Sequence, residues 1–282
     1  PSTNPAATPA NKIINALKGR NAVIVAPSPK GWATSKRLVE FVHAQFDRIG
    51  APRDLVQVLP APVDKASTLE LMRQCDLVVA TGSQANVRAA YASGTPAFGV
   101  GAGNVAGIVD ETADVEAAAD RITRSKTFDN ATSCSSENSL VLLDAAYDRV
   151  VAALVRRGAA LLDAPQTARL QALMWPDGKL SSAVIGQSAT VVAERAGFDA
   201  IAAAKPSMLL VPQRAGADGR GIGPDHPFSG EKLCPVLSLY RAAGFEEAAA
   251  IVERIYAFQG AGHSVGLHST RPERALQLGL TL

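Results

Sequence analysis

The feature that most limits the possible folds of this sequence is an alternation of short apolar runs with helical segments. In the first half, apolar runs at residues 21–26, 56–59 and 76–80 are each followed by a segment of helical periodicity. Strands separated by helices are joined by right-handed crossovers and therefore lie parallel. The sequence thus predicts an α/β fold with a parallel sheet.

The loops after these runs are candidate ligand sites, because ligands bind at the carboxyl ends of parallel strands. They are residues 27–31 and 81–83, together with residues 101–104, which follow a further apolar run at residues 97–101. The first loop has neither the Gly-x-Gly-x-x-Gly fingerprint of dinucleotide-binding proteins nor the Gly-x4-Gly-Lys-Ser/Thr phosphate loop. Gly82 and Ser83 stand between a strand and a helix N-terminus, which fits either an anion site or an ordinary turn.

The alternation restarts in the second half of the chain. A helical segment at residues 115–124 leads into a polar loop, and further apolar runs follow at residues 140–143, 208–211, 236–240 and 264–268. We therefore expect two α/β lobes, residues 1–125 and residues 126–282, with their boundary near Ser125. This boundary would place the polar loop in a cleft beside it.

The polar loop, residues 125–139, carries a single cysteine, Cys134. A cysteine among polar loop residues lies near backbone N–H groups, which can stabilise a thiolate and later an oxyanion. The alternative is a small buried apolar side chain, because free cysteines are among the most buried residues. The spacing alone leaves both interpretations open.

Composition excludes several classes of protein. The 282 residues are 47% hydrophobic and 19% charged, and the net charge of +2 gives no reason to expect a nucleic-acid or membrane partner. No apolar run approaches the ~18–20 residues of a membrane span. Three cysteines are too few and too scattered for a disulfide framework or a zinc site. We expect no metal and a cytoplasmic location.

The histidines and one charged pair allow other interpretations. His43 lies within a helical segment and is expected to be structural, whereas His226 and His263 could approach the thiol and form a Cys–His hydrolase. Glu231 and Lys232 follow a flexible segment, and the default interpretation is a solvated charge pair, since charged residues are mostly exposed.

Five segments together resemble a known family. They are Pro1-Ser2-Thr3-Asn4-Pro5, Gly99-Val100-Gly101-Ala102-Gly103-Asn104, Ser125-Lys126-Thr127-Phe128-Asp129-Asn130, the Cys134 loop, and Glu231-Lys232-Leu233-Cys234-Pro235. In order and spacing they are similar to the CoA-acylating branch of the aldehyde dehydrogenase superfamily. This branch includes the aldehyde half of bifunctional aldehyde–alcohol dehydrogenases and the acylating acetaldehyde, propionaldehyde and sulfoacetaldehyde dehydrogenases. The resemblance covers nearly the whole chain.

The resemblance implies an aldehyde dehydrogenase-like fold of two α/β lobes. Residues 1–125 would form a Rossmann-like nucleotide-binding lobe, and residues 126–282 a catalytic lobe that carries the thiol. Parts that the family has before Pro1 and after Leu282 are absent, so we interpret the sequence as a truncated piece. The resemblance also implies a homo-oligomer.

The same resemblance implies a two-step reaction of a small aldehyde. Cys134 would attack the aldehyde to give a thiohemiacetal, and loss of a hydride to the nicotinamide would leave a thioester. Asn4 and the backbone N–H of Cys134 would stabilise the oxyanion. The thiol of coenzyme A, the co-substrate, would then accept the acyl group.

Positions in the family also imply which residues bind the nucleotide. They are Ser28, Pro29 and Lys30 at the adenosine, Gly82 and Ser83 at the diphosphate, Gly101, and Glu231 at the nicotinamide ribose. No acidic residue follows the first apolar run directly, whereas Lys30, Lys36 and Arg37 do. Both NAD and NADP therefore remain open as the oxidant.

One position separates the acylating branch from hydrolytic relatives, which have a glutamate base where this chain has Val100. A general base raises the reaction rate by ~10²–10⁴-fold. Its absence therefore slows transfer of the acyl group to water more than transfer to a thiol, which ionises readily. The alternatives are a hydrolytic aldehyde dehydrogenase that releases a free acid and a non-catalytic nucleotide-binding or assembly module.

The residues beside the nucleophile depart from the commonest acylating pattern. Relatives often have Gly-Val/Thr-Ile and Ala-Ser where this chain has Ala131-Thr132-Ser133 and Ser135-Ser136. These extra hydroxyls would suit a small or polar aldehyde, and sulfoacetaldehyde is one candidate.

Overall fold

The computed structural model describes residues 4–82, 84–215 and 220–281. The chain divides into two compact units, Pro1–Ala102 and Gly103–Leu282. This division differs from the expected boundary near Ser125. The reason is that strand β5 (Val105–Val109) and helix α5 (Val115–Thr127) belong to the second unit, where β5 pairs with β6 (Glu137–Leu143).

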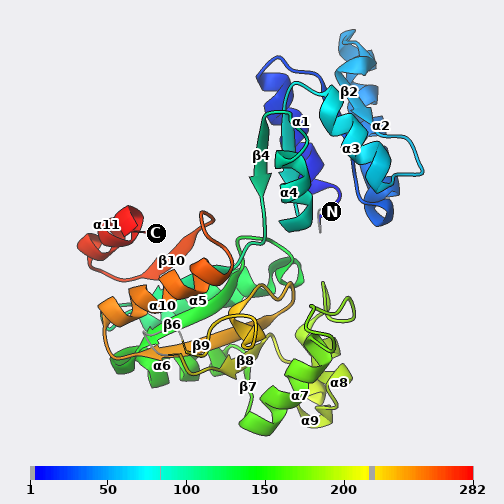
Figure 1. The fold of residues 1–282 in the computed structure, drawn as a ribbon. Coiled ribbons are helices and arrows are strands. Elements are labelled where there is room, and N and C mark those ends of the chain that lie inside the picture. The colour runs from blue at the N-terminus through cyan, green and yellow to red at the C-terminus, as the bar shows by residue number, and fades with distance from the viewer. Residues whose placement is uncertain (1–3, 83, 216–219, 282) are drawn as a thin grey trace. The chain divides into compact units, whose positions relative to one another are not determined.

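The first unit contains two pairs of parallel strands with helices between them (Figure 1). Strand β1 pairs with β2, and β3 pairs with β4. Its elements are α1 (Ala7–Lys18), β1 (Val23–Val25), the 3-10 turn Pro29–Gly31, α2 (Trp32–Ile49), the 3-10 turn Arg53–Leu55, β2 (Val56–Val58), α3 (Lys65–Gln74), β3 (Val78–Thr81), α4 (Gln84–Tyr91) and β4 (Ala97–Val100).

Local sequence explains where the helices of this unit begin and end. Asp64 and Ser67 form a reciprocal capping box at the start of α3. Helix α2 ends at Gly50, whose φ of 70° favours glycine. Helix α2 begins at Trp32, and the Ser35 hydroxyl in its first turn donates to the Pro5 carbonyl at 2.8 Å.

The second unit is built on a six-stranded sheet with the order β10-β5-β6-β9-β8-β7. Every strand pair in it is parallel, which confirms the predicted α/β fold with a parallel sheet. Its further elements are α6 (Asp144–Arg156), β7 (Ala160–Leu161), α7 (Ala164–Met174), α8 (Ala189–Arg195), α9 (Asp199–Ala203), β8 (Leu209–Pro212), the 3-10 turn Pro227–Ser229, β9 (Val236–Ala242), α10 (Phe245–Phe258), β10 (Val265–His268) and α11 (Pro272–Thr281).

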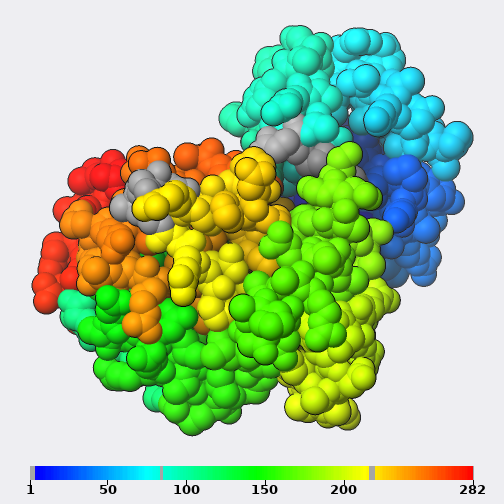
Figure 2. Space-filling model, turned by 60° about the horizontal axis from the view of Figure 1, so that its bottom comes forward, coloured from blue at the N-terminus to red at the C-terminus, as the bar shows by residue number. Residues whose placement is uncertain are grey.

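Helices cover both faces of this sheet (Figure 1). Leu140 and Leu142 of β6 pack in the cluster that includes α5 and α6. Val141 and Leu143 alternate with them and pack against α10 on the other face. Figure 2 shows one face of the second unit, coloured green to red.

Three elements and one strand start were not anticipated from the sequence. They are β7, α9 and α11, and the first residues of β6, which begins at Glu137 instead of Leu140. Asn138 and Ser139 are polar, yet both are buried in the strand. Their polarity concealed the beginning of β6, and Asn138 proves important for the site.

Among the described residues, no helix is long and apolar enough to cross a membrane. Within the same ranges, no group of three or more histidine, cysteine, aspartate or glutamate side chains could hold a metal ion.

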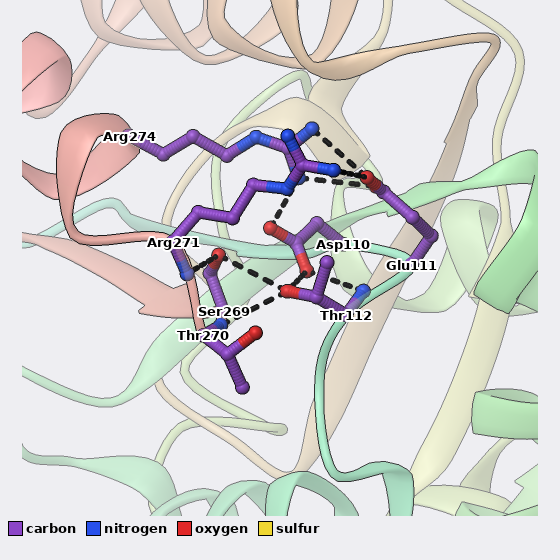
Figure 3. Close-up of polar contacts among 7 residues, drawn as sticks. All are labelled: Asp110, Glu111, Thr112, Ser269, Thr270, Arg271 and Arg274. Carbon is purple, nitrogen blue, oxygen red and sulfur yellow. Dashed lines mark hydrogen bonds and ion pairs between the residues drawn. The ribbon is translucent and has the colours of Figure 1, made fainter.

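A buried ion pair ties α11 to the edge of the sheet (Figure 3). The Arg274 guanidinium donates to the fully buried carboxylate of Asp110, which follows β5, and to Glu111 at 3.0 Å. Burial disfavours ionisation of Asp110, but hydrogen bonds from Ser269, Thr112 and Arg274 outweigh it and lower the pKa of this carboxyl.

We expect Arg274→Met to lower the free energy of unfolding by about 3–5 kcal/mol, because it leaves the buried Asp110 carboxylate without its cation. The matched control is Arg124→Met, which removes an exposed pair with Asp120 on the surface of α5 and should cost less than about 1 kcal/mol. Urea unfolding of both variants tests this, and equal costs would contradict a stabilising role for the Arg274–Asp110 pair.

Candidate active site

The Cys134 loop lies between the end of α5 and the start of β6. Helix α5 ends at Thr127, and a 3-10 turn, Phe128–Ala131, follows directly. Within it Asp129, Asn130 and Ala131 have positive φ angles of 49°, 49° and 58°. Left-handed backbone costs a residue with a Cβ roughly 1–2 kcal/mol. The turn is therefore held by contacts outside itself.

Side chains of the loop supply some of these contacts. The Thr132 hydroxyl donates to the Asp129 carbonyl at 2.9 Å and to its carboxylate at 2.8 Å. The Asn130 amide donates to the Gly186 carbonyl at 3.0 Å, and the Gly186 N–H donates to the Leu233 carbonyl at 2.8 Å. The loop is thus tied through Gly186 to the segment that contains Glu231.

Gly103 packs directly against the backbone of Cys134. A Cβ atom at residue 103 would lie 2.3 Å from the Cys134 carbonyl oxygen and 2.5 Å from the Cys134 Cβ. These distances are far below van der Waals contact, so only glycine fits here. The position of Cys134 is therefore set by the close approach of residue 103.

Both backbone groups of Gly103 are hydrogen-bonded within the second unit. Its N–H donates to the Glu231 carboxylate at 3.0 Å, and its carbonyl accepts from the Asn138 amide at 3.0 Å. The Lys232 N–H donates to the Asn138 side-chain oxygen at 3.0 Å. Asn138 thus joins Gly103 to the Glu231–Lys232 segment. Asn138 and Glu231 both bond to Gly103, the residue that positions Cys134.

The prediction of a solvated Glu231–Lys232 pair is wrong. Lys232 is fully buried, and its ammonium donates to the carbonyls of Asn138 and Gly230, both at 2.9 Å. Glu231 is only partly exposed. These two carbonyls make burial of the lysine possible, and one of them, Asn138, is 94 residues away, so the general tendency of charged residues to be exposed could not reveal it.

Burial dominates the electrostatics of this segment. It raises the pKa of Glu231, opposed by the Gly103 N–H and by the lysines Lys126 and Lys232. It lowers the pKa of Lys232, as does the neighbouring charge of Lys126. It raises the pKa of the Cys234 thiol to about 11. Cys234 is therefore an unreactive thiol at neutral pH.

Cys134 differs from Cys234 in its exposure. Its side chain is exposed, so the alternative of a buried apolar residue applies to Cys234 and not to Cys134. Within the described residues, the Cys134 N–H donates to no acceptor and can serve an oxyanion. The hydroxyls of Ser133 and Ser135, 2.9 Å apart, flank it in the sequence.

The histidines do not form a Cys–His pair in the part of the chain that the structure describes. His43 is structural as predicted, since its Nε2 lies 2.7 Å from the Val56 carbonyl oxygen. His263 contacts the Ser264 hydroxyl at 2.9 Å through Nδ1. His226 is exposed, and no hydrogen bond joins it to Cys134.

The residues expected at the adenosine lie in one turn of the first unit. Ser28 begins the 3-10 turn after β1, and its hydroxyl accepts from the Gly31 N–H at 3.2 Å. Pro29 and Lys30 within the turn are exposed. The Trp32 indole donates to the Leu59 carbonyl at 2.9 Å and links this turn to the end of β2.

The residues expected at the diphosphate follow the second pair of strands. Gly82 comes after β3, and its φ of 125° requires glycine. Its N–H donates to the Val100 carbonyl at 3.2 Å, beside Gly101 at the end of β4. Ser83 lies outside the described residues. The Gly101 and Ser83 assignments remain predictions.

Asn4 lies at the start of α1, where its side-chain oxygen accepts from the Ala6 and Ala7 N–H groups at 3.2 and 2.8 Å. These bonds orient the side chain. Asn4 and Cys134 belong to different units, so their pairing around an oxyanion remains a prediction.

Sequence reasoning missed the burial of Asn138 and Lys126 and the full role of Gly103. The burial of Lys126 could have been predicted, because this residue follows Ile122 by four positions on the apolar stripe of α5. The structure shows that it is fully buried. Gly103 was noted only as part of a glycine-rich segment. Asn138 had no local signal.

Comparison with known proteins agrees with this arrangement. The model of the aldehyde dehydrogenase family matches residues 3–170. The chain is 62% identical to an acylating sulfoacetaldehyde dehydrogenase of Cupriavidus necator over all of its own length and 56% of that relative. It therefore spans little more than half of that protein.

Two solved structures are also similar. An acetylating aldehyde dehydrogenase of Geobacillus thermoglucosidasius is 32% identical with a TM-score of 0.92, over 99% of this chain and 60% of that one. A propionaldehyde dehydrogenase of Rhodopseudomonas palustris, with bound CoA and an acylated cysteine, is 27% identical with a TM-score of 0.86, over 99% and 61%.

We expect Gly103→Ala to displace the Cys134 backbone and to lower the free energy of unfolding by about 1–3 kcal/mol, because the added methyl cannot be accommodated. The matched control is Gly244→Ala, where the added Cβ meets nothing within 4 Å. Denaturant unfolding and the rate of Cys134 alkylation measure the two effects. Identical behaviour of the two variants would contradict the close packing described above.

Proposed function

Since the chain belongs to the aldehyde dehydrogenase family, we propose that it carries the nucleophile of a CoA-acylating aldehyde dehydrogenase. The reaction is the reversible oxidation of a small aldehyde to its acyl-CoA, with NAD or NADP as the oxidant. The observation that carries this proposal is the exposed Cys134, fixed against Gly103 on a strained loop with its own N–H available.

The loop geometry supports nucleophilic attack by Cys134. The thiolate adds to the aldehyde carbon, and the carbonyl oxygen becomes an oxyanion that the Cys134 N–H stabilises. Asn4 supplies the second donor, and such a donor is worth about 3–4 kcal/mol. Oxidation of the thiohemiacetal leaves a thioester on Cys134, which the thiol of CoA then releases.

The residues present fit a nicotinamide nucleotide, which supplies the hydride acceptor when it is bound. The Glu231 carboxylate is partly exposed and can accept hydrogen bonds from ribose hydroxyls. Gly82, at a positive φ after β3, allows close approach of a diphosphate. Ser28, Pro29 and Lys30 are assigned to the adenosine and Ser83 to the diphosphate, and Gly101 is assigned to the cofactor site.

The residue at position 100 determines whether CoA or water accepts the acyl group. Val100 cannot act as the general base that hydrolytic relatives use to activate water. A thiol ionises more readily than water, so transfer to CoA needs less assistance. Release of a free acid is therefore the minor outcome.

We propose sulfoacetaldehyde as the substrate, because an acylating sulfoacetaldehyde dehydrogenase is 62% identical to this chain. The hydroxyls of Ser133 and Ser135 flank Cys134 and can donate hydrogen bonds to a sulfonate. The enzyme is expected to act as a cytoplasmic homo-oligomer. A reducing compartment agrees with the three free cysteines of the described chain.

We expect reduction of NAD or NADP by sulfoacetaldehyde to require both CoA and Cys134. The complete gene product that contains this sequence is assayed by nicotinamide absorbance with a panel of small aldehydes. Cys134→Ala should lower turnover by roughly 10⁴-fold or more, because it removes the nucleophile. Cys75→Ala, which removes a thiol of the first unit, is the matched control and should retain activity.

Three other outcomes would contradict the proposal. Sustained turnover without CoA, with release of a free acid, would identify a hydrolytic enzyme. Absence of turnover with every aldehyde, combined with a Cys134 that reacts with iodoacetamide at the rate of a simple thiol, would indicate a non-catalytic module. Hydrolysis without a nicotinamide would indicate a Cys–His hydrolase.

A further inference from the structure

The glutamine that ends α10, Gln259, reaches the segment that contains Glu231. Its backbone N–H closes the helix by donating to the Ile255 carbonyl. Its side-chain oxygen accepts from the Glu231 N–H at 2.8 Å, across 28 residues of sequence. The end of one helix therefore holds the backbone of the residue whose carboxylate is assigned to the nicotinamide ribose.

Glu231 and Lys232 lie outside the helices and strands, before β9 begins. Backbone N–H groups that are shielded from water need an acceptor wherever they lie. Here the acceptors are side-chain amides, because the Glu231 N–H donates to Gln259 and the Lys232 N–H donates to the Asn138 side-chain oxygen at 3.0 Å. Two amide side chains thus replace the neighbouring strand that would hold such a segment within a sheet.

The bond from Gln259 completes a closed ring of contacts around Glu231. The Glu231 carboxylate accepts from the Gly103 N–H at 3.0 Å. The next residue, Asn104, donates through its amide to the Gln259 backbone carbonyl at 3.1 Å, and the Gln259 side chain returns to the Glu231 N–H. The ring therefore holds Glu231 at its backbone and at its carboxylate, and it includes Gly103, the residue that positions Cys134.

Close packing leaves the Gln259 side chain little freedom. A Cβ at Gly230 would lie 2.8 Å from the Gln259 side-chain oxygen, and a Cβ at Gly260 would lie 2.8 Å from the Asn104 carbonyl oxygen. Asn104 is fully buried, and its amide also donates to the Ser229 carbonyl at 2.7 Å. Two glycines therefore make room for the approach of Gln259 to the loop.

We propose that Gln259 is a positioning residue that fixes the backbone of Glu231, so that its carboxylate is held in place for hydrogen bonds to the nicotinamide ribose. The Gly103 N–H restrains one carboxylate oxygen, whereas Gln259 fixes the point from which the glutamate side chain extends. Such support matters, because a displacement of about 1 Å is enough to weaken binding and catalysis strongly. The proposal rests on the nucleotide-binding role given to Glu231 in the proposed function.

The test measures the Kd for NAD and NADP by fluorescence titration of the complete gene product, without aldehyde or CoA. Gln259→Met removes the acceptor and keeps the length of the side chain. It should raise the Kd by about tenfold, the change that corresponds to loss of one hydrogen bond, with a smaller change in kcat. The matched control is Gln277→Met, which removes a surface contact with Glu246 and should leave the Kd unchanged.

Three further variants separate positioning from a structural role. Gln259→Glu keeps an oxygen that can accept from the Glu231 N–H and should restore most of the affinity. Gly230→Ala leaves Gln259 present but directs a methyl group against its oxygen, so it should raise the Kd as Gln259→Met does. In a Glu231→Ala background, Gln259→Met should cause no further loss of affinity, because it acts through that carboxylate.

Distinct results would overturn this inference. An unchanged Kd in folded Gln259→Met protein would refute the positioning role, and a lower melting temperature with the same Kd would identify Gln259 as purely structural. An equal loss of affinity with and without the Glu231 carboxylate would show that Gln259 acts elsewhere. If Gln259→Met does not fold, Gly230→Ala and its combination with Glu231→Ala decide. Failure of the natural protein to bind either nucleotide would overturn the proposed function instead, so the two failures are distinguishable.

Discussion

The close approach of Gly103 to Cys134 is the constraint on which the candidate site depends. No side chain fits between them, because a Cβ at residue 103 would lie 2.3 Å from the Cys134 carbonyl oxygen. The same glycine is bonded through its N–H to Glu231 and through its carbonyl to Asn138. One short stretch of backbone therefore couples the nucleophile to the carboxylate assigned to the nucleotide.

Around this contact the second unit contains buried polar and charged groups in place of apolar side chains. Its sheet is apolar over most of its length, with Leu140 and Val141 fully buried on opposite faces. At the start of β6 the pattern changes, and Asn138 and the buried ammonium of Lys232 replace apolar packing with hydrogen bonds. Polar groups in such a position are costly unless they are paired, and they are typical of a functional site.

The sequence predicted the regular parts of the fold because they depend on local pattern. Apolar runs located β1, β2 and β9 to within two residues at each end. For Cys134 the residues alone left an exposed nucleophile and a buried apolar side chain open, and the structure shows an exposed side chain. Buried polar groups were missed because their partners are distant in sequence: the bond from Lys232 to Asn138 spans 94 residues. Lys126 was overlooked although it lies on the apolar stripe of its helix.

The most direct test of the central claim is detection of the acyl group on the enzyme. The complete gene product is incubated with sulfoacetaldehyde and NAD or NADP in the absence of CoA, quenched in acid and examined by peptide mass spectrometry. We expect an acyl group on the peptide that contains Cys134, and its release as acyl-CoA when CoA is added. Acylation of another cysteine, or steady release of free acid with Cys134 unmodified, would contradict it.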